Sequence, residues 1–178
     1  GWNALVENTT GISNVALGVN AMYANTTGST NTAIGNSTLR YNTTGESNTA
    51  TGEGALYNNT TGGTNTANGV NALNSNTEGG NNVAIGYSAG RKNTSGSGNV
   101  FIGNESGNND NYQTSSNKLI VANSNTTTPL IEGDFSAATL NLNGALTANS
   151  VSSANFVPTG IGEKYIEITI EGVYGAGN

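Results

Sequence analysis

The stretch NTTGSTNTAIGNSTLRYNTTGESNTATG, residues 25–52, contains the same short motifs twice. NTTG begins at Asn25 and again at Asn42, and an NTA motif begins six residues after each of them. Such a stretch is either low-complexity sequence that stays disordered or a repeat that folds. The spacing of these motifs along the rest of the chain distinguishes the two.

Four series of residues keep a spacing of 17 positions over the first 103 residues. The series are Gly11, Gly28, Gly45, Gly62, Gly79 and Gly96; Asn14, Asn31, Asn48, Asn65, Asn82 and Asn99; Gly18, Gly35, Gly52, Gly69, Gly86 and Gly103; and Asn8, Asn25, Asn42, Asn59, Asn76 and Asn93. Compositional drift in a disordered segment would not keep four series in phase. A strict period indicates one structural unit per repeat.

The composition alone would suggest disorder. Asn, Gly and Thr supply 32, 26 and 25 of the 178 residues, a bias typical of unfolded chains. Charged residues make up only 9%, however, and Pro129 and Pro158 both lie outside the repeats. The net charge is −6 with no basic run, which argues against nucleic acid and anionic membrane surfaces as partners. No apolar stretch approaches the roughly 20 residues that cross a bilayer, so direct membrane insertion is not expected.

A unit of 17 residues is too short and too rich in glycine for two helices, but it suits one coil of a β-solenoid or β-roll. The sequence predicts one strand that begins at Asn14 and recurs every 17 residues, as in NVALG and NTAIG. It predicts a second strand centred on residues 4–5, 21–22, 38–39, 55–56 and 72–73. The series of Gly11 and of Gly18 mark two bends, where positive φ or close backbone approach favours glycine.

The middle residue of the first strand indicates a thin interior, because it stays small until Phe101. The small residues are Ala16, Ala33, Ala50, Ala67 and Ala84. Their neighbours, such as Val15 and Leu17, point to the opposite face by strand alternation, and that face is partly apolar. A single coil buries too little apolar surface to offset the entropy lost on ordering it. We therefore expect this face to pack against other chains in an obligate oligomer.

The motifs NTAIG at 31–35 and NVAIG at 82–86 carry a family resemblance. They resemble the NSVAIG-type head repeats of trimeric autotransporter adhesins of the YadA-like family. With NTTG in the turn, the repeat looks still closer to repeats of bacteriophage-type tail fibres and related fibre adhesins. The resemblance covers about residues 1–107, and it weakens where Thr51 and Asn68 replace the apolar residue.

This resemblance implies an all-β, left-handed parallel β-roll in which three chains pack around one axis as a homotrimer. It also implies an extracellular location, at a cell surface or on a phage or phage-like fibre. Thr51 and Asn68 would then make polar layers near the axis. Such layers either set the register, hold an axial water or anion, or reflect drift of the repeat.

The sequence predicts three regions. They are a β-roll domain at 1–107, a β-rich connector at 108–146, and a trimeric stalk with a C-terminal strand at 147–178. KLIVAN, PLIEGDF and ATLNLNG, which begin at Lys118, Pro129 and Ala138, predict three connector strands. EKYIEITIEG at 163–172 alternates isoleucine with polar residues and predicts a half-buried strand, which either begins a tip domain or caps the C-terminus.

Residues for catalysis are scarce. The chain has no His and no Cys, and no fixed carboxylate pair or base-activated nucleophile emerges. We expect no enzyme activity, no metal and no cofactor. The loop NESGNNDN at 104–111 offers oxygens to a hard cation, but it is interpreted as a solvated loop. The Asn-Thr-Thr sites at Asn8, Asn25, Asn42 and Asn59 fit the N-glycosylation sequon and are interpreted as turn residues that hydrogen-bond the bend.

Two functional hypotheses follow. The first is an adhesive or receptor-binding fibre that contacts glycans through Tyr23, Arg40, Tyr41, Tyr57 and Arg91, because aromatic faces and planar polar groups suit sugars. Plain solvent exposure is the alternative for each residue. The second is a structural spacer that presents a separate binding tip, which the monotony of the repeat favours. Ice binding, which needs a flat Thr-x-Thr array, is disfavoured because the paired threonines are adjacent and lie beside a glycine bend.

Overall fold

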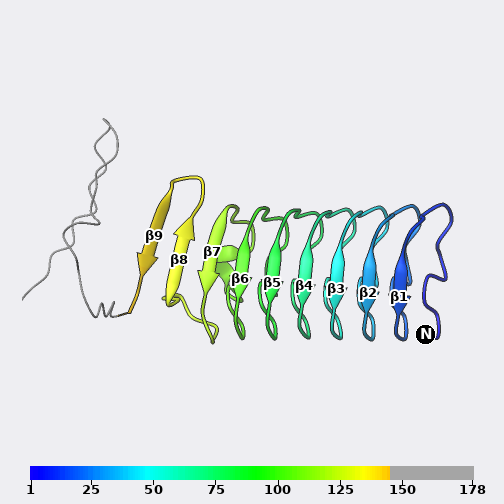
Figure 1. Cartoon of the computed structure of the whole chain (residues 1–178), viewed down its shortest axis with the longest axis horizontal. Helices are drawn as coiled ribbons and strands as arrows, with labels where there is room; N and C mark the ends of the chain where they lie inside the picture. The colour runs from blue at the N-terminus through cyan, green and yellow to red at the C-terminus, as the bar shows by residue number, and fades with distance from the viewer. Residues whose placement is uncertain (145–178) are drawn as a thin grey trace, which may run out of the picture. The chain divides into compact units, whose positions relative to one another are not determined.

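The computed structural model describes residues 1–144, whose strands form one nine-stranded sheet (Figure 1). The elements are β1 (Val15–Leu17), β2 (Thr32–Ile34), β3 (Thr49–Thr51), β4 (Thr66–Asn68), β5 (Val83–Ile85), β6 (Val100–Ile102), the 3-10 helix η1 (Asp110–Tyr112), β7 (Lys118–Val121), β8 (Ile131–Asp134) and β9 (Thr139–Leu142). Strands β1 to β7 pair in parallel in chain order. Strands β8 and β9 complete the sheet in antiparallel pairing.

The pairing register equals the sequence period. Ala16 lies opposite Ala33, and each residue from β1 to β5 pairs with the residue 17 positions later. Consecutive repeats are therefore consecutive coils of a parallel β-solenoid, as the sequence predicts. Each coil adds about 4.8 Å along the stack.

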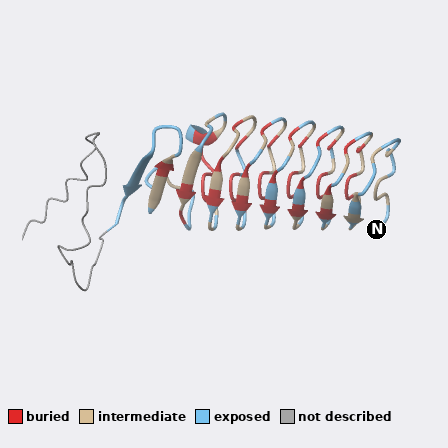
Figure 2. Ribbon diagram, turned by 45° about the horizontal axis from the view of Figure 1, so that its top comes forward, coloured by how far each residue is buried: buried red, intermediate tan, exposed pale blue. Residues whose placement is uncertain are grey.

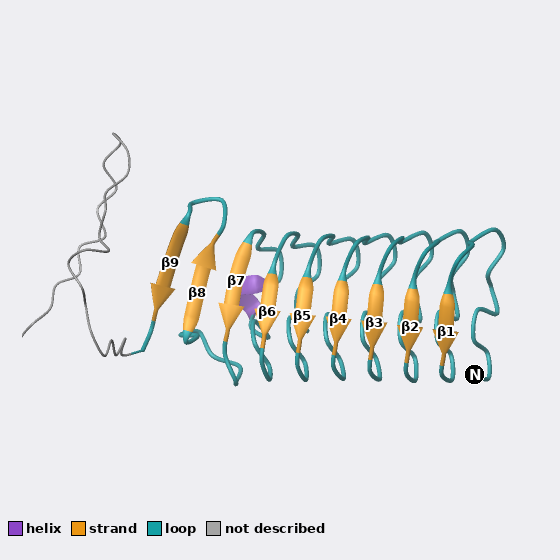
Figure 3. Cartoon of the chain, viewed as in Figure 1, coloured by secondary structure: helices purple, strands orange, loops and turns teal. Residues whose placement is uncertain are grey.

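Each coil contains one strand, so the prediction of a second strand in each repeat is wrong (Figure 3). The second segment is instead a run of turns, which we call the turn segment: residues 19–24, 36–41, 53–58, 70–75 and 87–92. Asn20 and Met22 both have positive φ, 55° and 51°. The N–H of Asn20 donates to Trp2 in the preceding coil, and that of Met22 donates to Thr38 in the following coil. In a strand, N–H groups two residues apart point to the same neighbour.

Bulky side chains occupy these left-handed positions because their burial offsets the strain. Met22, Leu39, Leu56 and Leu73 have φ between 49° and 51°, and all four are fully buried. The left-handed conformation costs roughly 1–2 kcal/mol per residue. Complete burial of a side chain of this size contributes about 1.5–3 kcal/mol.

The two glycine series serve the two purposes expected of them. Gly18 and its equivalents have φ between 111° and 144°, a region that only glycine adopts readily. Gly28 and its equivalents are required by close stacking instead, since a Cβ atom at Gly28 would overlap the carbonyl oxygen of Gly45. Both bends therefore exclude larger residues.

Buried residues lie both on the strands β2 to β6 and in the turn segments (Figure 2). The strands contribute Ala33, Ala50, Ala67 and Ala84, which are at most 1% exposed. The turn segments contribute the buried Met22 and the leucines that follow it at the same position. A small residue on one side faces a large residue on the other, so the thin interior predicted from the alanine series is confirmed.

A ladder of buried asparagines runs along the NTTG bends. Its members are Asn25, Asn42, Asn59, Asn76 and Asn93. The Nδ2 of Asn42 donates to the Oδ1 of Asn25 at 2.7 Å and to the carbonyl of Gly45 at 3.0 Å. Both N–H groups of the amide are thus used inside the stack. The sequon asparagines in this ladder are turn residues, as predicted.

A second buried ladder precedes the strands. Its members are Asn31, Asn48, Asn65, Asn82 and Asn99. The Nδ2 of Asn48 donates to the Oδ1 of Asn31 at 3.1 Å and to the carbonyl of Gly62 at 2.9 Å. Its own Oδ1 accepts the backbone N–H of Asn65 at 3.0 Å. Each asparagine therefore provides a hydrogen-bond acceptor for the next asparagine of the ladder and a donor for the carbonyl group of the adjacent bend.

The last coil fills its interior in the opposite way. Phe101 is fully buried at the strand position that alanine holds elsewhere. Gly90 and Gly107 occupy the turn position of the leucines, and a Cβ atom at either would overlap the Phe101 ring. The ring of Tyr112 meets that of Phe101 at a steep angle, with centroids 6.3 Å apart. Large and small residues have exchanged sides, which keeps the core filled.

The three predicted connector strands are present as β7, β8 and β9. Lys118 lies opposite Asp134 in the register, and the two side chains form an ion pair. The hydroxyl of Tyr112 donates to the Glu132 carboxylate at 2.8 Å. All residues of β9 are exposed. The predicted stalk and C-terminal strand at 147–178 lie outside the described residues.

Candidate functional site

The outward side chains of β1 to β7 form one surface, which we call the strand face. Its apolar members are Val15, Leu17, Ile34, Val83, Ile85, Val100, Ile102, Leu119 and Val121. Leu17, Ile85 and Ile102 are 61%, 45% and 39% exposed. Thr51 and Asn68, which pair with each other in the register, separate two apolar blocks. The chain by itself leaves uncovered the face that the sequence predicts to be covered.

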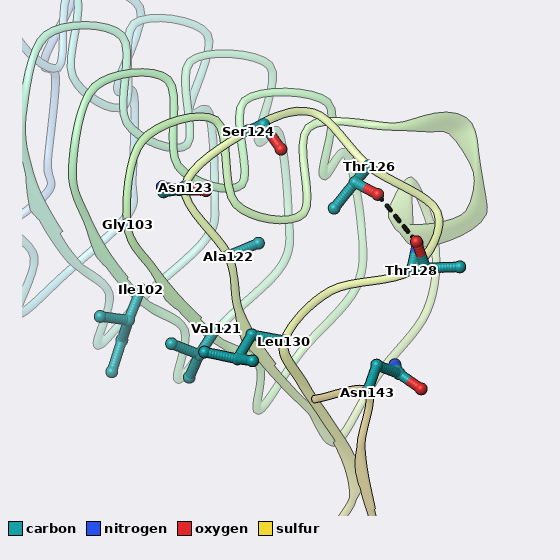
Figure 4. A pocket seen from close by; sticks show the side chains of 10 residues that line it. All are labelled: Ile102, Gly103, Val121, Ala122, Asn123, Ser124, Thr126, Thr128, Leu130 and Asn143. Carbon is teal, nitrogen blue, oxygen red and sulfur yellow. Dashed lines mark hydrogen bonds between the residues drawn. The ribbon is translucent and has the colours of Figure 1, made fainter. Parts of the chain in front are cut away.

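An apolar hollow of about 580 Å³ lies at the β7 end of the strand face (Figure 4). Ile102 of β6, Val121 of β7 and Leu130 before β8 line it. Thr126 and Thr128 line its polar edge, with their hydroxyl oxygens 3.2 Å apart. The hollow therefore extends the apolar block at this end of the stack.

Four of the five predicted ligand-binding residues lie together and form the Tyr–Arg cluster: Tyr23, Arg40, Tyr41 and Tyr57. The Arg40 guanidinium carbon lies 5.9, 5.3 and 5.8 Å from the ring centroids of Tyr23, Tyr41 and Tyr57. Its Nη1 donates to the Tyr57 hydroxyl at 3.2 Å. The rings of Tyr41 and Tyr57 meet edge to face, with centroids 5.1 Å apart. Three consecutive coils thus build one positively charged aromatic surface.

The rings hold Arg40 in place electrostatically. Its Nε is buried and lacks a hydrogen-bond partner, and cation–π contacts of this kind offset part of the lost hydration. The Tyr57 hydroxyl raises the pKa of Tyr41 above its ordinary value. The cluster therefore presents a fixed cation framed by aromatic rings.

Arg91, the fifth predicted residue, does not join the cluster. It lies two coils beyond Tyr57 on the same ladder, and Asn74 occupies the coil between them. At about 4.8 Å per coil, this places Arg91 about 10 Å farther along the stack. The 17-residue spacing identifies the ladder, but only consecutive coils bring long side chains into contact.

A polar groove of about 260 Å³ adjoins the cluster at Arg40 and Tyr57, and we call it the Gly54 groove. Its other lining residues are Ser37, Glu53, Gly54, Asn58, Asn71 and Asn74. Gly54 has φ 64°, close to the values of 51° to 57° at its equivalents. Those equivalents are Asn20, Ser37, Asn71 and Ser88. Gly54 places no side chain in the groove, and the amides of Asn71 and Asn74 occupy the space next to it.

Sequence reasoning missed this groove. The signal was a glycine in a ladder of asparagine and serine, which is hard to notice in a chain with 26 glycines. Asn74 partly fills the space, because its Nδ2 donates to the carbonyl of Gly54 at 2.9 Å and to the Oδ1 of Asn71 at 3.3 Å. The Nδ2 of Asn58 donates to the carbonyl of Asn74 at 3.1 Å. These bonds hold the amide groups of Asn58 and Asn74 in place.

The Gly54 groove and the strand face lie on opposite sides of the coil. Ala50 enters the core from β3 and Leu56 enters it from the turn segment, and both are fully buried in the same cluster. The outward groups of the two segments consequently point away from each other. A ligand in the groove would not compete with a chain that covers the strand face.

The loop at 104–111 is less solvated than predicted. Ser106 is fully buried and its hydroxyl donates to the carbonyl of Ile120 at 2.8 Å. Asn109 is 9% exposed and caps η1 through the N–H of Asn111. The loop closes the last coil over Phe101, which explains why its middle faces inward. In the part of the chain that the structure describes, no three His, Cys, Asp or Glu side chains gather closely enough to hold a metal ion.

Comparison of the chain with family models, with characterised proteins and with solved structures finds no significant match. In residues 1–144, no helix is long and apolar enough to span a bilayer. The parallel solenoid, the strand face and the Gly54 groove are therefore the basis for any functional assignment.

Proposed function

We propose that the chain is a segment of a homotrimeric, non-enzymatic surface fibre that acts in adhesion. In this proposal three left-handed rolls pack around one axis through their strand faces, outside the cell or on a phage-like particle. The observation that carries it is the exposed strand face, because monomeric soluble proteins rarely expose a large contiguous apolar patch. Identical ladders on each chain suit a closed cyclic assembly. The resemblance to trimeric fibre repeats supports three chains and the left-handed winding.

The polar residues of the strand face fit this arrangement. Thr51 and Asn68 would approach their own copies near the axis, where hydroxyl and amide groups can both donate and accept hydrogen bonds. Such layers fix the register of the three chains at a small cost in apolar burial.

The assembly is tested by measuring mass in solution. Light scattering at micromolar concentration is expected to give three times the chain mass of 17.9 kDa. Ile85→Asp should reduce this mass, because it would place three carboxylates at the apolar interface. Asn81→Asp adds the same charge at an exposed position off the strand face and should leave the mass unchanged. A single-chain mass for the unaltered protein would refute the trimer.

We propose further that the Tyr–Arg cluster contacts glycans on the surface to which the fibre adheres. Support comes from its position on the turn side of the coil, where the assembly leaves it accessible. Support also comes from its chemistry, since stacked tyrosines present amphipathic faces and Arg40 and the nearby amides supply polar contacts.

A glycan array separates adhesion from a spacer role. The full chain is expected to bind, and Tyr23→Ala/Tyr57→Ala should abolish most of the signal. Arg91→Ala is the matched control, because Arg91 lies on the same ladder but outside the cluster. Binding that is equally unaffected by both changes, or no binding at all, favours the spacer.

A further inference from the structure

We propose that the Gly54 groove binds one ring of a neutral sugar, a hexose or N-acetylhexosamine that carries no acidic group. This inference rests on the proposed adhesive function. It assigns the ligand class and adds Glu53, Gly54 and Asn74 to the residues that recognise it.

The size of the groove favours a single ring. Its volume of about 260 Å³ lies just below the roughly 300–1,000 Å³ of pockets for drug-sized ligands. A second ring would therefore lie outside the groove, over the Tyr–Arg cluster that adjoins it.

The lining chemistry matches hydroxyl groups, which both donate and accept hydrogen bonds. Acceptors are the Glu53 carboxylate and the Oδ1 atoms of Asn58 and Asn74. No protein donor contacts these two Oδ1 atoms in the described part of the chain. The donor is Arg40, which lines the groove. The Ser37 hydroxyl donates to the Oδ1 of Asn36 and can accept a hydrogen bond from the ligand.

The charge of the groove argues against an acidic sugar. Glu53 has no ion-pair partner among residues 1–144, so a carboxylate or sulfate on the ligand would face its negative charge. Arg40 lines the same groove with the opposite charge, so the two charged residues sum to zero and give an acidic sugar no net attraction. Placing two like charges in one site weakens binding, so Glu53 disfavours ligands that carry a negative charge.

Side chains that line the groove are already held in place by contacts within the chain. Tyr57 is fixed by the hydrogen bond from Arg40 and by the edge of Tyr41. Asn74 is fixed by its bonds to Gly54 and Asn71. Groups that are already ordered lose little entropy on binding, which suits recognition of a small ligand.

The test places a side chain in the groove at Gly54, which also shifts the amides of Asn71 and Asn74 that line it. Gly54→Asn restores the residue type of the ladder at a φ that Asn20 and Asn71 already adopt. The new Cβ atom would first meet the Oδ1 of Asn71 and the Nδ2 of Asn74, which are ends of side chains and able to move. Asn20→Ser is the matched control, since it exchanges the two usual residues of this ladder in a coil outside the groove.

The full 178-residue chain and both variants are applied to an array of neutral glycans and their sialylated and sulfated counterparts. The unaltered chain should bind neutral glycans at least tenfold more strongly than acidic ones. Gly54→Asn should lower that signal at least tenfold with an unchanged melting temperature, and Asn20→Ser should leave it unaltered. Glu53→Gln should reduce the difference between the binding signals of neutral and acidic glycans.

The outcomes separate this inference from the proposed function. Binding that is lost in Tyr23→Ala/Tyr57→Ala but kept in Gly54→Asn would leave adhesion standing and overturn the groove assignment. Equal or stronger binding of acidic glycans would overturn the assignment of a neutral sugar as the ligand. No binding by the unaltered chain would overturn both proposals.

Discussion

The repeating coils and the closing segment, residues 103–144, hold one sheet together by different chemistry. In the coils, buried asparagines pair with their own copies one coil away. In the closing segment, Lys118 pairs with Asp134 and Tyr112 with Glu132. An amide both donates and accepts, so identical amides satisfy one another, whereas a charged residue stacked on its copy would be repelled. A strict period therefore favours asparagine in the interior, whereas both ion pairs among residues 1–144 include a residue of the closing segment.

Breaking an amide ladder should have the largest effect. Asn48→Ala leaves the N–H of Asn65 without a partner in the interior. It also removes one of the two donors to the Oδ1 of Asn31 and one of the two donors to the carbonyl of Gly62. At about 2 kcal/mol for the unsatisfied N–H and about 1 kcal/mol for each of the two other lost hydrogen bonds, the unfolding free energy should fall by about 4 kcal/mol. Urea denaturation at fixed protein concentration measures the change.

The control for this change is Asn36→Ala, since Asn36 is exposed on the turn segment. It should alter the unfolding free energy by less than about 0.5 kcal/mol. Similar losses for the two variants would mean that buried amide pairing does not stabilise the coils.

The boundary between the two regions offers a double-mutant cycle. Phe101→Ala empties the last coil and should cost about 3–4 kcal/mol, and Gly90→Leu alone should clash with the Phe101 ring. The double variant restores the arrangement of the earlier coils, where leucine faces alanine. It should be more stable than either single variant, as thermal unfolding would show. Additive losses would contradict the idea that large and small residues exchange sides here.

Much of the fold is predictable from the sequence because the period sets the register. Inward alanine and outward Val15 and Leu17 follow from strand alternation alone. The turn segment is not predictable in this way. An Ala-Leu pair indicates a strand by its apolar character, and nothing local shows that Leu56 adopts a positive φ. The backbone accepts that conformation only because the stacked coils bury the side chain.

The candidate site is likewise predictable from the sequence only in part. Tyr23, Arg40 and Tyr57 could be placed on one ladder because their spacing is 17, and Tyr41 because it follows Arg40. Their convergence depends on side-chain length and on coil spacing, which excludes Arg91. The Gly54 groove depends on an absent side chain, and a single sequence gives no measure of what neighbouring coils place around it.

A smaller change tests whether the strand face of the coils is an interface. Thr51→Ile would extend the apolar block of Leu17 and Ile34 by one coil, up to Asn68, and in the proposed trimer it should stabilise each chain by about 1 kcal/mol. Thr61→Ile makes the same exchange at an exposed position in the NTTG bend and should give no gain. Melting temperatures at several protein concentrations measure the difference. Equal responses would indicate that the strand face remains in solvent.

The smallest effect should come from the closing segment and should depend on pH. The Lys118 ammonium, the Ser136 hydroxyl and the N–H of Ala137 hold the pKa of Asp134 well below its usual range. A carboxyl whose pKa is lower in the folded state stabilises the fold fully above about pH 4, the ordinary Asp value, and loses that contribution as the pH falls toward the folded value. The stability difference between the unaltered chain and Asp134→Asn should therefore shrink between pH 6 and pH 3.

The same pH range also distinguishes the closing segment from the coils, when the stability losses of Asp134→Asn and Asn48→Ala are compared. Among residues 1–144, the fully buried polar side chains are amides and hydroxyls, none of which titrates in this range. The loss caused by Asn48→Ala should consequently stay constant from pH 6 to pH 3 while that of Asp134→Asn declines. A constant Asp134→Asn difference would mean that the ion pair with Lys118 contributes nothing to the pairing of β7 with β8.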